Sequence, residues 1–352
     1  MIEAVAHIAG MDSYALADLG PDSAVSLAQN ESLAPPCPAA LAAGQAALAA
    51  AALYPDPDWT DLRRAIGQAH PNLQGEVLCG AGSMELIGAL VRAYAGPGDQ
   101  VLGTAYGYAF LASAAQQAGA GYAAAPEARY TVSVDAILEA VTPVTRLVCV
   151  CNPGNPTGTA LPNADIVRLR DALPAHVLLL VDQAYAEFDP QDHAPIMGLV
   201  ARGDTVVTRT LSKAYGLAGA RVGWGVFPAH VAAELRKLLN PNNISASSQA
   251  MATAAMQDQA YMRGVVAETA RIRDAFSARL RAAGYDVPAS AGNFVLIPFA
   301  DVGAARTADT ALKQAGFILR AMGGYGLSHC LRATIGAAPH MDAVATLLEE
   351  LA

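Results

Sequence analysis

The sequence is poor in charged residues, and above all in positively charged ones. Only 15% of its 352 residues are charged, and 22 Lys and Arg stand against 31 Asp and Glu, which gives a formal net charge of −9. No stretch concentrates basic residues that could follow a phosphate backbone, so nucleic-acid binding is disfavoured. The hydrophobic share is 53%, which is ample for a sizeable core and argues against disorder.

We also expect neither a membrane-spanning segment nor a secretory signal in this sequence. The most apolar stretch, 38–53, is nearly all alanine, and Asp56 and Asp58 follow it. We therefore expect one helix between Pro38 and Pro55 rather than a membrane span. Because no basic region followed by an apolar one opens the sequence, we expect a cytoplasmic protein.

Cysteines are few, and their number is odd. The five are Cys37, Cys79, Cys149, Cys151 and Cys330, and their scattered spacing indicates a reducing compartment rather than a disulfide framework. Cys149 and Cys151 point to the same face of an expected strand. Since no second pair of Cys or His stands at ligand spacing, we expect core residues there and no metal site.

Short apolar runs alternate with helical stretches through the first two thirds of the chain. The runs are rich in Val, Leu and Cys, a composition typical of strands that are buried on both faces of a sheet. This order predicts an α/β fold, with a large domain in which helices sandwich a mostly parallel sheet. The expected strands are 76–79, 100–102, 146–151, 177–181, 205–208 and 221–227, and the expected helices are 84–94, 109–118, 134–141 and 164–172.

The pattern changes after residue 240. A long helical region is expected over 247–283, followed by strands at 293–299, 317–320 and 330–335, with one helix among them and a last helix at the C-terminus. These elements predict a smaller α+β domain. We therefore divide the chain into an N-terminal arm or part of the small domain (1–29), a large ligand-binding domain (30–240) and a small C-terminal domain (241–352).

Four polar motifs stand where expected strands end. A glycine-rich turn at 79–85 leads into a helix, an Asn-Pro turn spans 151–158, Asp182 ends an apolar run, and Lys213 lies among Ser, Gly and Ala. Each alone has a simpler interpretation as a tight turn, a helix cap or an exposed lysine. Because ligands of open α/β sheets bind at the carboxyl ends of the strands, we expect the four to meet. Helix amides suit a phosphate, and a buried lysine can lose its proton and form an imine, so the set suits pyridoxal 5′-phosphate.

These motifs carry a family resemblance. The Asn-Pro-Thr-Gly run at 155–158, the Asp-Gln-Ala-Tyr run at 182–185, the Ser-Lys pair at 212–213 and Arg221 eight residues later form a specific combination. The chain resembles the class I/II pyridoxal-phosphate aminotransferases of fold type I, and most of all the histidinol-phosphate aminotransferases, from residue 30 to residue 332. It departs from their pattern at Gln183, where glutamate is usual, and at Thr104, where proline is common.

The resemblance implies roles around the cofactor. It makes Lys213 the residue that forms the imine with the cofactor and then moves protons, and it pairs Asp182 with the ring nitrogen. Tyr106 matches the aromatic that stacks on the ring, although simple core packing is an alternative. Tyr54 matches a tyrosine that reaches the phosphate from a partner subunit, which implies a homodimer with shared active sites. The remaining implied contacts are Asn155 and Tyr185 to the phenolic oxygen, and Ser83, Met84, Ser212 and Arg221 to the phosphate.

The resemblance also implies a substrate end. Arg332 matches the arginine that clamps the substrate carboxylate, a task suited to a bidentate guanidinium, and Asn30 would lie near the same carboxylate. Arg320 matches a second arginine that binds the substrate phosphate in histidinol-phosphate enzymes. Tyr14 matches an N-terminal tyrosine that closes over the substrate side chain.

The function implied is that of an aminotransferase. It would move an amino group between an amino acid or amino phosphate, with histidinol phosphate as first choice, and 2-oxoglutarate. Two alternatives remain on the same scaffold: an aromatic or other amino-acid aminotransferase, and a decarboxylase of the threonine-phosphate type. The expected partners are these small molecules and a second copy of the chain, with neither nucleic acid nor membrane.

Overall fold

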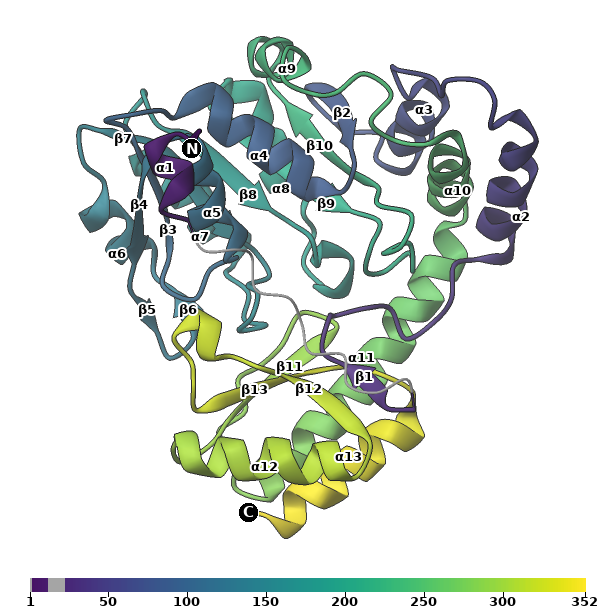
Figure 1. Cartoon of the computed structure of the whole chain (residues 1–352), viewed down its shortest axis with the longest axis vertical. Coiled ribbons are helices and arrows are strands. Elements are labelled where there is room, and N and C mark those ends of the chain that lie inside the picture. The colour runs from purple at the N-terminus through teal and green to yellow at the C-terminus, as the bar shows by residue number, and fades with distance from the viewer. Residues whose placement is uncertain (1, 12–22) are drawn as a thin grey trace.

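The computed structural model describes residues 2–11 and 23–352. Two sheets, each covered by helices, define a large domain and a small domain, with helix α11 (Gln259–Ala282) running between them (Figure 1). None of the described helices combines the length and apolarity needed to cross a bilayer.

The large domain is built on a seven-stranded sheet within the described ranges. Its strand order is β2-β10-β9-β8-β7-β3-β4, and β10 alone runs antiparallel to its neighbours, which confirms the predicted mostly parallel sheet. Strand β10 begins two residues later than expected because Arg221 adopts a left-handed conformation, with φ of 54°. The strands are β2 (Glu76–Gly80), β3 (Gln100–Thr104), β4 (Gly121–Ala125), β7 (Thr145–Cys151), β8 (Leu178–Asp182), β9 (Thr205–Thr210) and β10 (Gly223–Phe227).

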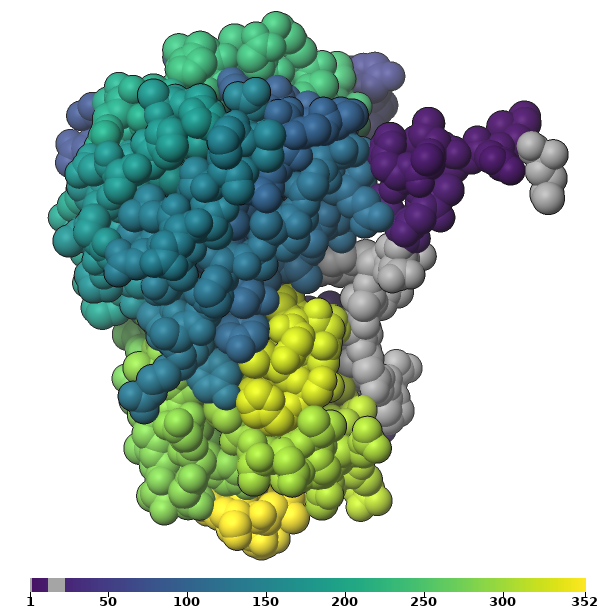
Figure 2. Space-filling view, turned by 90° about the vertical axis from the view of Figure 1, so that its left-hand side faces the viewer, coloured from purple at the N-terminus to yellow at the C-terminus, as the bar shows by residue number. Residues whose placement is uncertain are grey.

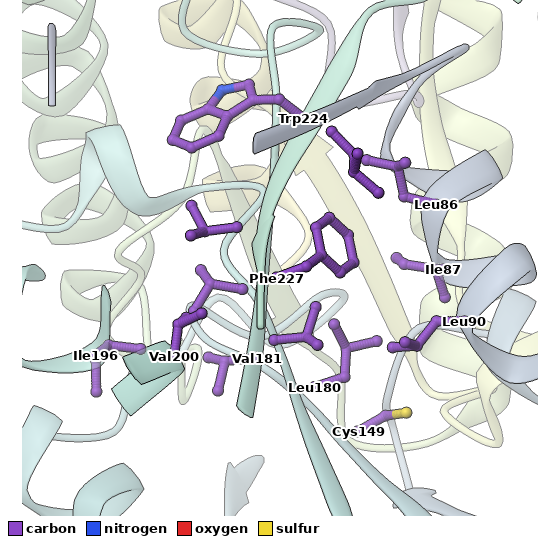
Figure 3. Packing of buried hydrophobic residues seen from close by; sticks show 14 of the residues in the cluster. Leu86, Ile87, Leu90, Cys149, Leu180, Val181, Ile196, Val200, Trp224 and Phe227 are labelled. Carbon is purple, nitrogen blue, oxygen red and sulfur yellow. The ribbon is translucent and has the colours of Figure 1, made fainter. Parts of the chain in front are cut away.

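Helices cover both faces of this sheet and build the larger core. On α4, Leu86, Ile87 and Leu90 share one face at helical spacing and pack with Phe227 of β10 (Figure 3). Each such fully buried side chain contributes about 1.5–3 kcal/mol relative to exposure. The large-domain helices are α3 (Thr60–Ala69), α4 (Ser83–Tyr94), α5 (Phe110–Gln117), α6 (Val134–Ala140), α7 (Asn163–Ala172), α8 (Ala194–Gly198) and α9 (Ala229–Arg236), with 3₁₀ turns η2 (Ala186–Phe188) and η3 (Leu199–Arg202).

The small domain contains a four-stranded sheet of order β1-β12-β13-β11. Strand β1 comes from the N-terminal part of the chain and pairs in parallel with β12, and Leu27 lies in the small core. The elements are β1 (Val25–Leu27), β11 (Phe294–Pro298), β12 (Phe317–Ala321) and β13 (Cys330–Thr334), with helices α12 (Val302–Gln314) and α13 (Ala338–Glu350) and the 3₁₀ turn η4 (Gly323–Tyr325).

Two expected helices differ in the structure. The alanine-rich helix divides into α2 (Pro38–Ala47) and the 3₁₀ turn η1 (Leu48–Ala50). The region expected as one helix over 247–283 is two, α10 (Ala246–Gln257) and α11, because Asp258 leaves helical geometry and its side chain accepts a hydrogen bond from the amide of Tyr261.

The cores also place the domain boundary differently from the sequence-based division at 240/241. Helix α10 packs on α2 and α3, and Met256 and Met262 belong to the large core. Ile272 and Phe276, farther along α11, belong to the small core. The change from one core to the other therefore falls inside α11.

Two peripheral elements complete the description. The short helix α1 (Ala6–Ala9) lies beside α5, and Figure 2 shows the purple N-terminal residues extending away from the large domain. A hairpin of β5 (Glu127–Ala128) and β6 (Thr131–Val132) reaches the small domain, where the hydroxyl of Tyr130 and Nε2 of His329 lie 3.0 Å apart.

Candidate active site

A cavity of about 450 Å³ lies between the two domains at the carboxyl ends of β7, β8 and β9. Its walls come from the large domain, from the segment after β1, and from β12, η4 and β13 of the small domain. The structure brings most of the sequence-predicted site residues together in its lining: Asn30, Ser83, Met84, Asn155, Asp182, Tyr185, Ser212, Lys213, Arg221, Arg320 and Arg332.

One end of the cavity is an anion cradle. Helix α4 begins at Ser83 after Gly82, whose φ of 81° is in the left-handed region. A Cβ on Gly82 would lie 2.5 Å from Nη2 of Arg221, and a Cβ on Gly223 would overlap the backbone of Ser83. Only glycines therefore let the guanidinium and the first helix amides converge here, and those amides lack partners within their own helix.

Hydrogen bonds between distant residues, which the sequence did not predict, hold the first turn of α4 and the loop before it in place. One carboxylate oxygen of Glu85 accepts hydrogen bonds from the amide of Ala81 and from Nδ2 of Asn243, each at 2.6 Å. Nε1 of Trp59 donates in turn to Oδ1 of Asn243 at 3.0 Å. Asn243 stands in a polar turn 158 positions from Glu85, and such a turn signals no partner by itself.

Asp182 is a buried carboxylate surrounded by neutral donors. It is the last residue of β8 and is 7% exposed. Within the described part of the chain, hydroxyl, thiol and backbone amide groups donate to it, and no cation pairs with it. Burial raises the pKa of Asp182 to about 6 even though these hydrogen bonds oppose the rise. A cationic group of a ligand would therefore be stabilised beside it.

Lys213 supplies the amine of the cavity. Its Nζ donates a hydrogen bond to the carbonyl of Gln29 at 3.1 Å. Burial, followed by the positive charge of Arg332, lowers the pKa of Lys213 to about 7. A large fraction of the side chain is therefore uncharged near neutral pH, the state that can attack a carbonyl or accept a proton.

Hydrogen bonds from both domains orient the polar side chains that lie around Asp182 and Lys213. Nδ2 of Asn30 donates to the hydroxyl of Tyr185 at 3.0 Å, and Nη1 of Arg332 donates to Oδ1 of Asn155 at 2.7 Å. The amide oxygen of Asn155 is thus occupied, so its nitrogen is the group left for a ligand oxygen. Asn30 holds a left-handed conformation, with φ of 53°, in which its amide donates to Oγ1 of Thr334.

Two arginines form the positively charged end of the cavity. Arg320 of β12 and Arg332 of β13 are direct partners in the antiparallel register, and both line the cavity. Such a pair in a protein of net charge −9 focuses positive potential on the cavity and suits anionic substrates. The register of the two strands, which the sequence did not predict, creates the pair.

Among the described residues, two predicted site residues, Tyr106 and Tyr54, are not part of the cavity lining. Tyr106 packs against Tyr130, with ring centroids 6.1 Å apart, while Tyr108, two residues later, lines the cavity. Two aromatics so close in sequence gave no local signal of which one faces inward. Tyr54 is 88% exposed. Tyr14 lies outside the described residues.

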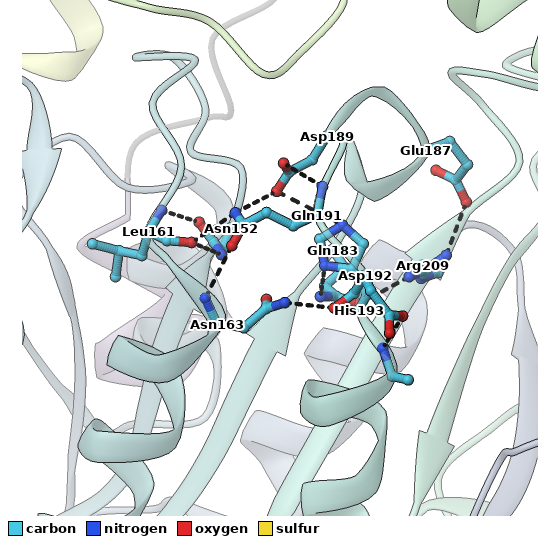
Figure 4. A network of polar contacts seen from close by, with 11 residues as sticks. Asn152, Leu161, Asn163, Gln183, Glu187, Asp189, Gln191, Asp192, His193 and Arg209 are labelled. Carbon is cyan, nitrogen blue, oxygen red and sulfur yellow. Dashed lines mark hydrogen bonds and ion pairs between the residues drawn. The ribbon is translucent and has the colours of Figure 1, made fainter.

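The unusual Gln183 faces the other side of the sheet. Its Oε1 accepts a hydrogen bond from Nη2 of Arg209 at 3.1 Å, and its Nε2 lies 3.2 Å from Nδ1 of His193 (Figure 4). Arg209 also pairs with the buried carboxylate of Glu187 at 3.4 Å. This departure from the family pattern therefore lies in a supporting network rather than in the cavity.

The donor set of the cavity fits pyridoxal 5′-phosphate. Helix amides and Arg221 suit its phosphate, the buried carboxylate of Asp182 suits its ring nitrogen, Asn155 and Tyr185 suit its phenolic oxygen, and Lys213 suits its aldehyde. No cluster of metal-ligating side chains occurs among the described residues.

Comparisons with known proteins agree with this chemistry. Residues 22–351 match the family described as aminotransferase class I and II. The chain is 43% identical over 335 residues to histidinol-phosphate aminotransferase of Paramagnetospirillum magneticum, covering 94% of this chain and 92% of that one. The corresponding protein of Rhodospirillum centenum is 44% identical over 325 residues, with coverages of 92% and 90%. The crystal structure of histidinol-phosphate aminotransferase from Sinorhizobium meliloti in complex with pyridoxal-5′-phosphate superposes with a TM-score of 0.90 at 29% identity, covering 100% of this chain and 98% of that one.

Proposed function

Because the chain belongs to the class I and II aminotransferases, we propose that it exchanges an amino group between histidinol phosphate and a 2-oxo acid, with 2-oxoglutarate as the acceptor. It is a transaminase of fold type I that depends on pyridoxal 5′-phosphate. The observation that carries the choice of substrate is the in-register pair of Arg320 and Arg332 beside Lys213, since both proposed substrates are anions.

The cofactor, when bound, supplies an aldehyde that condenses with amines and a ring that withdraws electrons from the substrate Cα. The amides of Ser83 and Met84, with Arg221, would bind its phosphate. Tyr108, which lines the cavity in place of Tyr106, would face the ring.

The chain's own residues perform the proton movements. The ionised carboxylate of Asp182 would hold a proton on the ring nitrogen of the cofactor. Lys213, with its pKa near 7, would accept the proton from the substrate Cα and return it at C4′ of the cofactor, so that the amino group passes from substrate to cofactor. Asn155 and Tyr185 would bind the phenolic oxygen through hydrogen-bonding groups that Arg332 and Asn30 orient.

At the substrate end, each of the two arginines is assigned to a different anionic group. We assign Arg332 to the carboxylate of the oxo acid and of its amino form, because its guanidinium is fixed by Asn155 and by the carbonyl of Ala28 at 2.7 Å each. Arg320 is assigned to the phosphate ester of the amino donor. Asn30, which also lines the cavity, would lie near the same carboxylate.

A donor screen with the Arg320→Leu variant tests this assignment. Purified protein loaded with cofactor is given histidinol phosphate, phenylalanine, tyrosine or threonine phosphate, and conversion of the cofactor to its amine form is followed by absorbance. We expect histidinol phosphate to give the highest kcat/KM. Loss of a charged hydrogen-bonding partner in Arg320→Leu should lower that value roughly 10- to 100-fold, while leaving phenylalanine nearly unaffected.

The control for this experiment is Arg306→Leu, an exposed arginine on α12 of the same domain. It should behave as the wild type. An equal loss for phosphorylated and unphosphorylated donors in Arg320→Leu would contradict the phosphate assignment. A wild-type preference for phenylalanine or tyrosine, or release of carbon dioxide from threonine phosphate, would replace the proposed substrate.

We also propose a cytoplasmic homodimer in which Tyr54 completes the partner's phosphate cradle. Leu48, Leu53 and Tyr54 are 61%, 73% and 88% exposed on one segment after α2, more apolar surface than a solvent-facing segment needs. Sedimentation velocity should give a dimer. Tyr54→Phe should weaken cofactor binding several-fold without dissociating that dimer, whereas Tyr94→Phe on α4 should not. Unchanged affinity in Tyr54→Phe would contradict the shared site.

A further inference from the structure

Asp182 is flanked by a donor on each neighbouring strand. In the parallel register it stands opposite Cys151 of β7 on one side and Thr208 of β9 on the other. Residues opposite one another on adjacent strands point to the same face of the sheet. Oγ1 of Thr208 donates to Oδ1 of Asp182 at 2.9 Å, and Sγ of Cys151 donates to Oδ2 at 3.7 Å. Each carboxylate oxygen thus has its own side-chain donor.

The surroundings keep both donors neutral and protonated. Thr208 is fully buried, and Cys151 is 9% exposed. Burial raises the pKa of the Cys151 thiol well above its usual range, and the carboxylate beside it adds to the rise, so this sulfur keeps its proton at any physiological pH. A thiol and a hydroxyl stabilise a carboxylate by hydrogen bonding and leave its negative charge in place. A lysine or an arginine would neutralise that charge.

We propose that Thr208 and Cys151 are positioning residues that hold the Asp182 carboxylate in its ionised form and in a fixed plane, ready to bind the ring nitrogen of the cofactor. The inference rests on the proposed function for the identity of the ligand, but the contacts belong to the chain itself. Without the two donors, burial would drive Asp182 towards its protonated form, which cannot hold a proton on the ring nitrogen.

Few other groups lie close enough to affect the protonation of the Asp182 carboxylate. The backbone amide of Ala184 also donates to it, and the thiol of Cys149 and the phenol of Tyr185 lie close enough for the charge of Asp182 to raise their pKa values. The charged groups that share the cavity are Glu31, Lys213, Arg221, Arg320 and Arg332. Of the two side-chain hydrogen bonds that oppose the effect of burial, the one from the hydroxyl of Thr208 is the shorter, at 2.9 Å.

The test is a titration of Asp182 in the full chain without cofactor. Protein labelled with ¹³C at the aspartate carboxyl carbons is titrated by NMR, and the Asp182 signal is identified by its loss in Asp182→Asn. Thr208→Val should raise the pKa of Asp182 by about one unit, and Cys151→Ala should raise it by less, because a thiol is the weaker donor. Thr208→Ser should restore the wild-type value.

Two matched controls separate positioning from simple packing. Thr205→Val removes another buried hydroxyl on β9, whose Oγ1 donates to Asp204 instead, and Cys79→Ala removes another buried thiol of the same sheet, on β2. Neither should move the Asp182 titration. If the pKa of Asp182 is the same in Thr208→Val as in Thr205→Val, the proposal is overturned.

Cofactor affinity provides the second readout. The affinity of the full chain for pyridoxal 5′-phosphate, measured by fluorescence quenching against pH, should fall on the acid side as Asp182 becomes protonated. That fall should begin about one pH unit higher in Thr208→Val. A uniform loss of affinity at every pH would indicate a packing defect and overturn the positioning role. If the wild type binds no cofactor, the proposed function is contradicted. The NMR titration would still test whether Thr208 and Cys151 lower the pKa of Asp182.

Discussion

Lys213→Ala is expected to abolish turnover while leaving the fold intact. The side chain projects into the cavity, where its amine contacts only the carbonyl of Gln29 among the hydrogen bonds described, so the cores lose nothing. A positioned base alone contributes ~10²–10⁴-fold, and loss of the covalent attachment adds to this. Steady-state rates should therefore fall by at least about a thousandfold, and thermal unfolding should be nearly unchanged.

The matched control is Lys237→Ala, an exposed lysine after α9 that pairs with Glu234. It should retain full activity. Borohydride reduction of the wild-type protein with bound cofactor should fix a label at Lys213 and leave Lys237 unlabelled. Near-normal turnover in Lys213→Ala, or a label at another lysine, would refute the assignment.

The lowered pKa of Lys213 predicts a distinctive pH dependence. Because burial disfavours the ammonium form, the amine loses its proton near pH 7 rather than near its ordinary value. Its reactivity towards acetic anhydride in the cofactor-free chain should rise up to about pH 7 and then level off. Mass spectrometry of the acetylated Lys213 peptide at each pH measures this curve. A reactivity of Lys213 that keeps rising well above pH 7 would contradict a buried, deprotonated amine.

Asp182→Asn is expected to leave the cofactor bound but to slow the proton transfer at Cα severely. The amide keeps the size of the carboxylate and can still accept from Thr208, yet it carries no charge to hold a proton on the ring nitrogen. Removing one fixed electrostatic partner of a developing charge typically costs ~10²–10³-fold. Single-turnover kinetics with histidinol phosphate should show this loss in the chemical step, with substrate affinity little changed.

Asp189→Asn is the matched control, because Asp189 is also buried and hydrogen-bonded but lies outside the cavity. It should react at the wild-type rate. Wild-type single-turnover rates in Asp182→Asn would remove the carboxylate from the mechanism.

Local sequence was sufficient for the strands that form the floor of the site. The run 177–181 is entirely apolar and matches β8 to within one residue at each end, because a strand buried on both faces favours apolar side chains. The weak strand β4 escaped prediction, since Gly121 and three alanines give no β-signal. Likewise, the break at Asp258 was invisible in a long run of good helix formers.

The sequence by itself determined the chemistry of this protein. The glycine turn, the Asn-Pro turn, Asp182 and Lys213 each follow a buried strand, and parallel strands deliver their carboxyl ends to one edge. The tertiary structure alone decided which side chains act together. Tyr108 rather than Tyr106 lines the cavity, Asn30 bonds Tyr185 from 155 positions away, and Arg320 stands opposite Arg332. These contacts depend on strand order and register, which arise from packing between distant segments and leave no periodic trace in the chain.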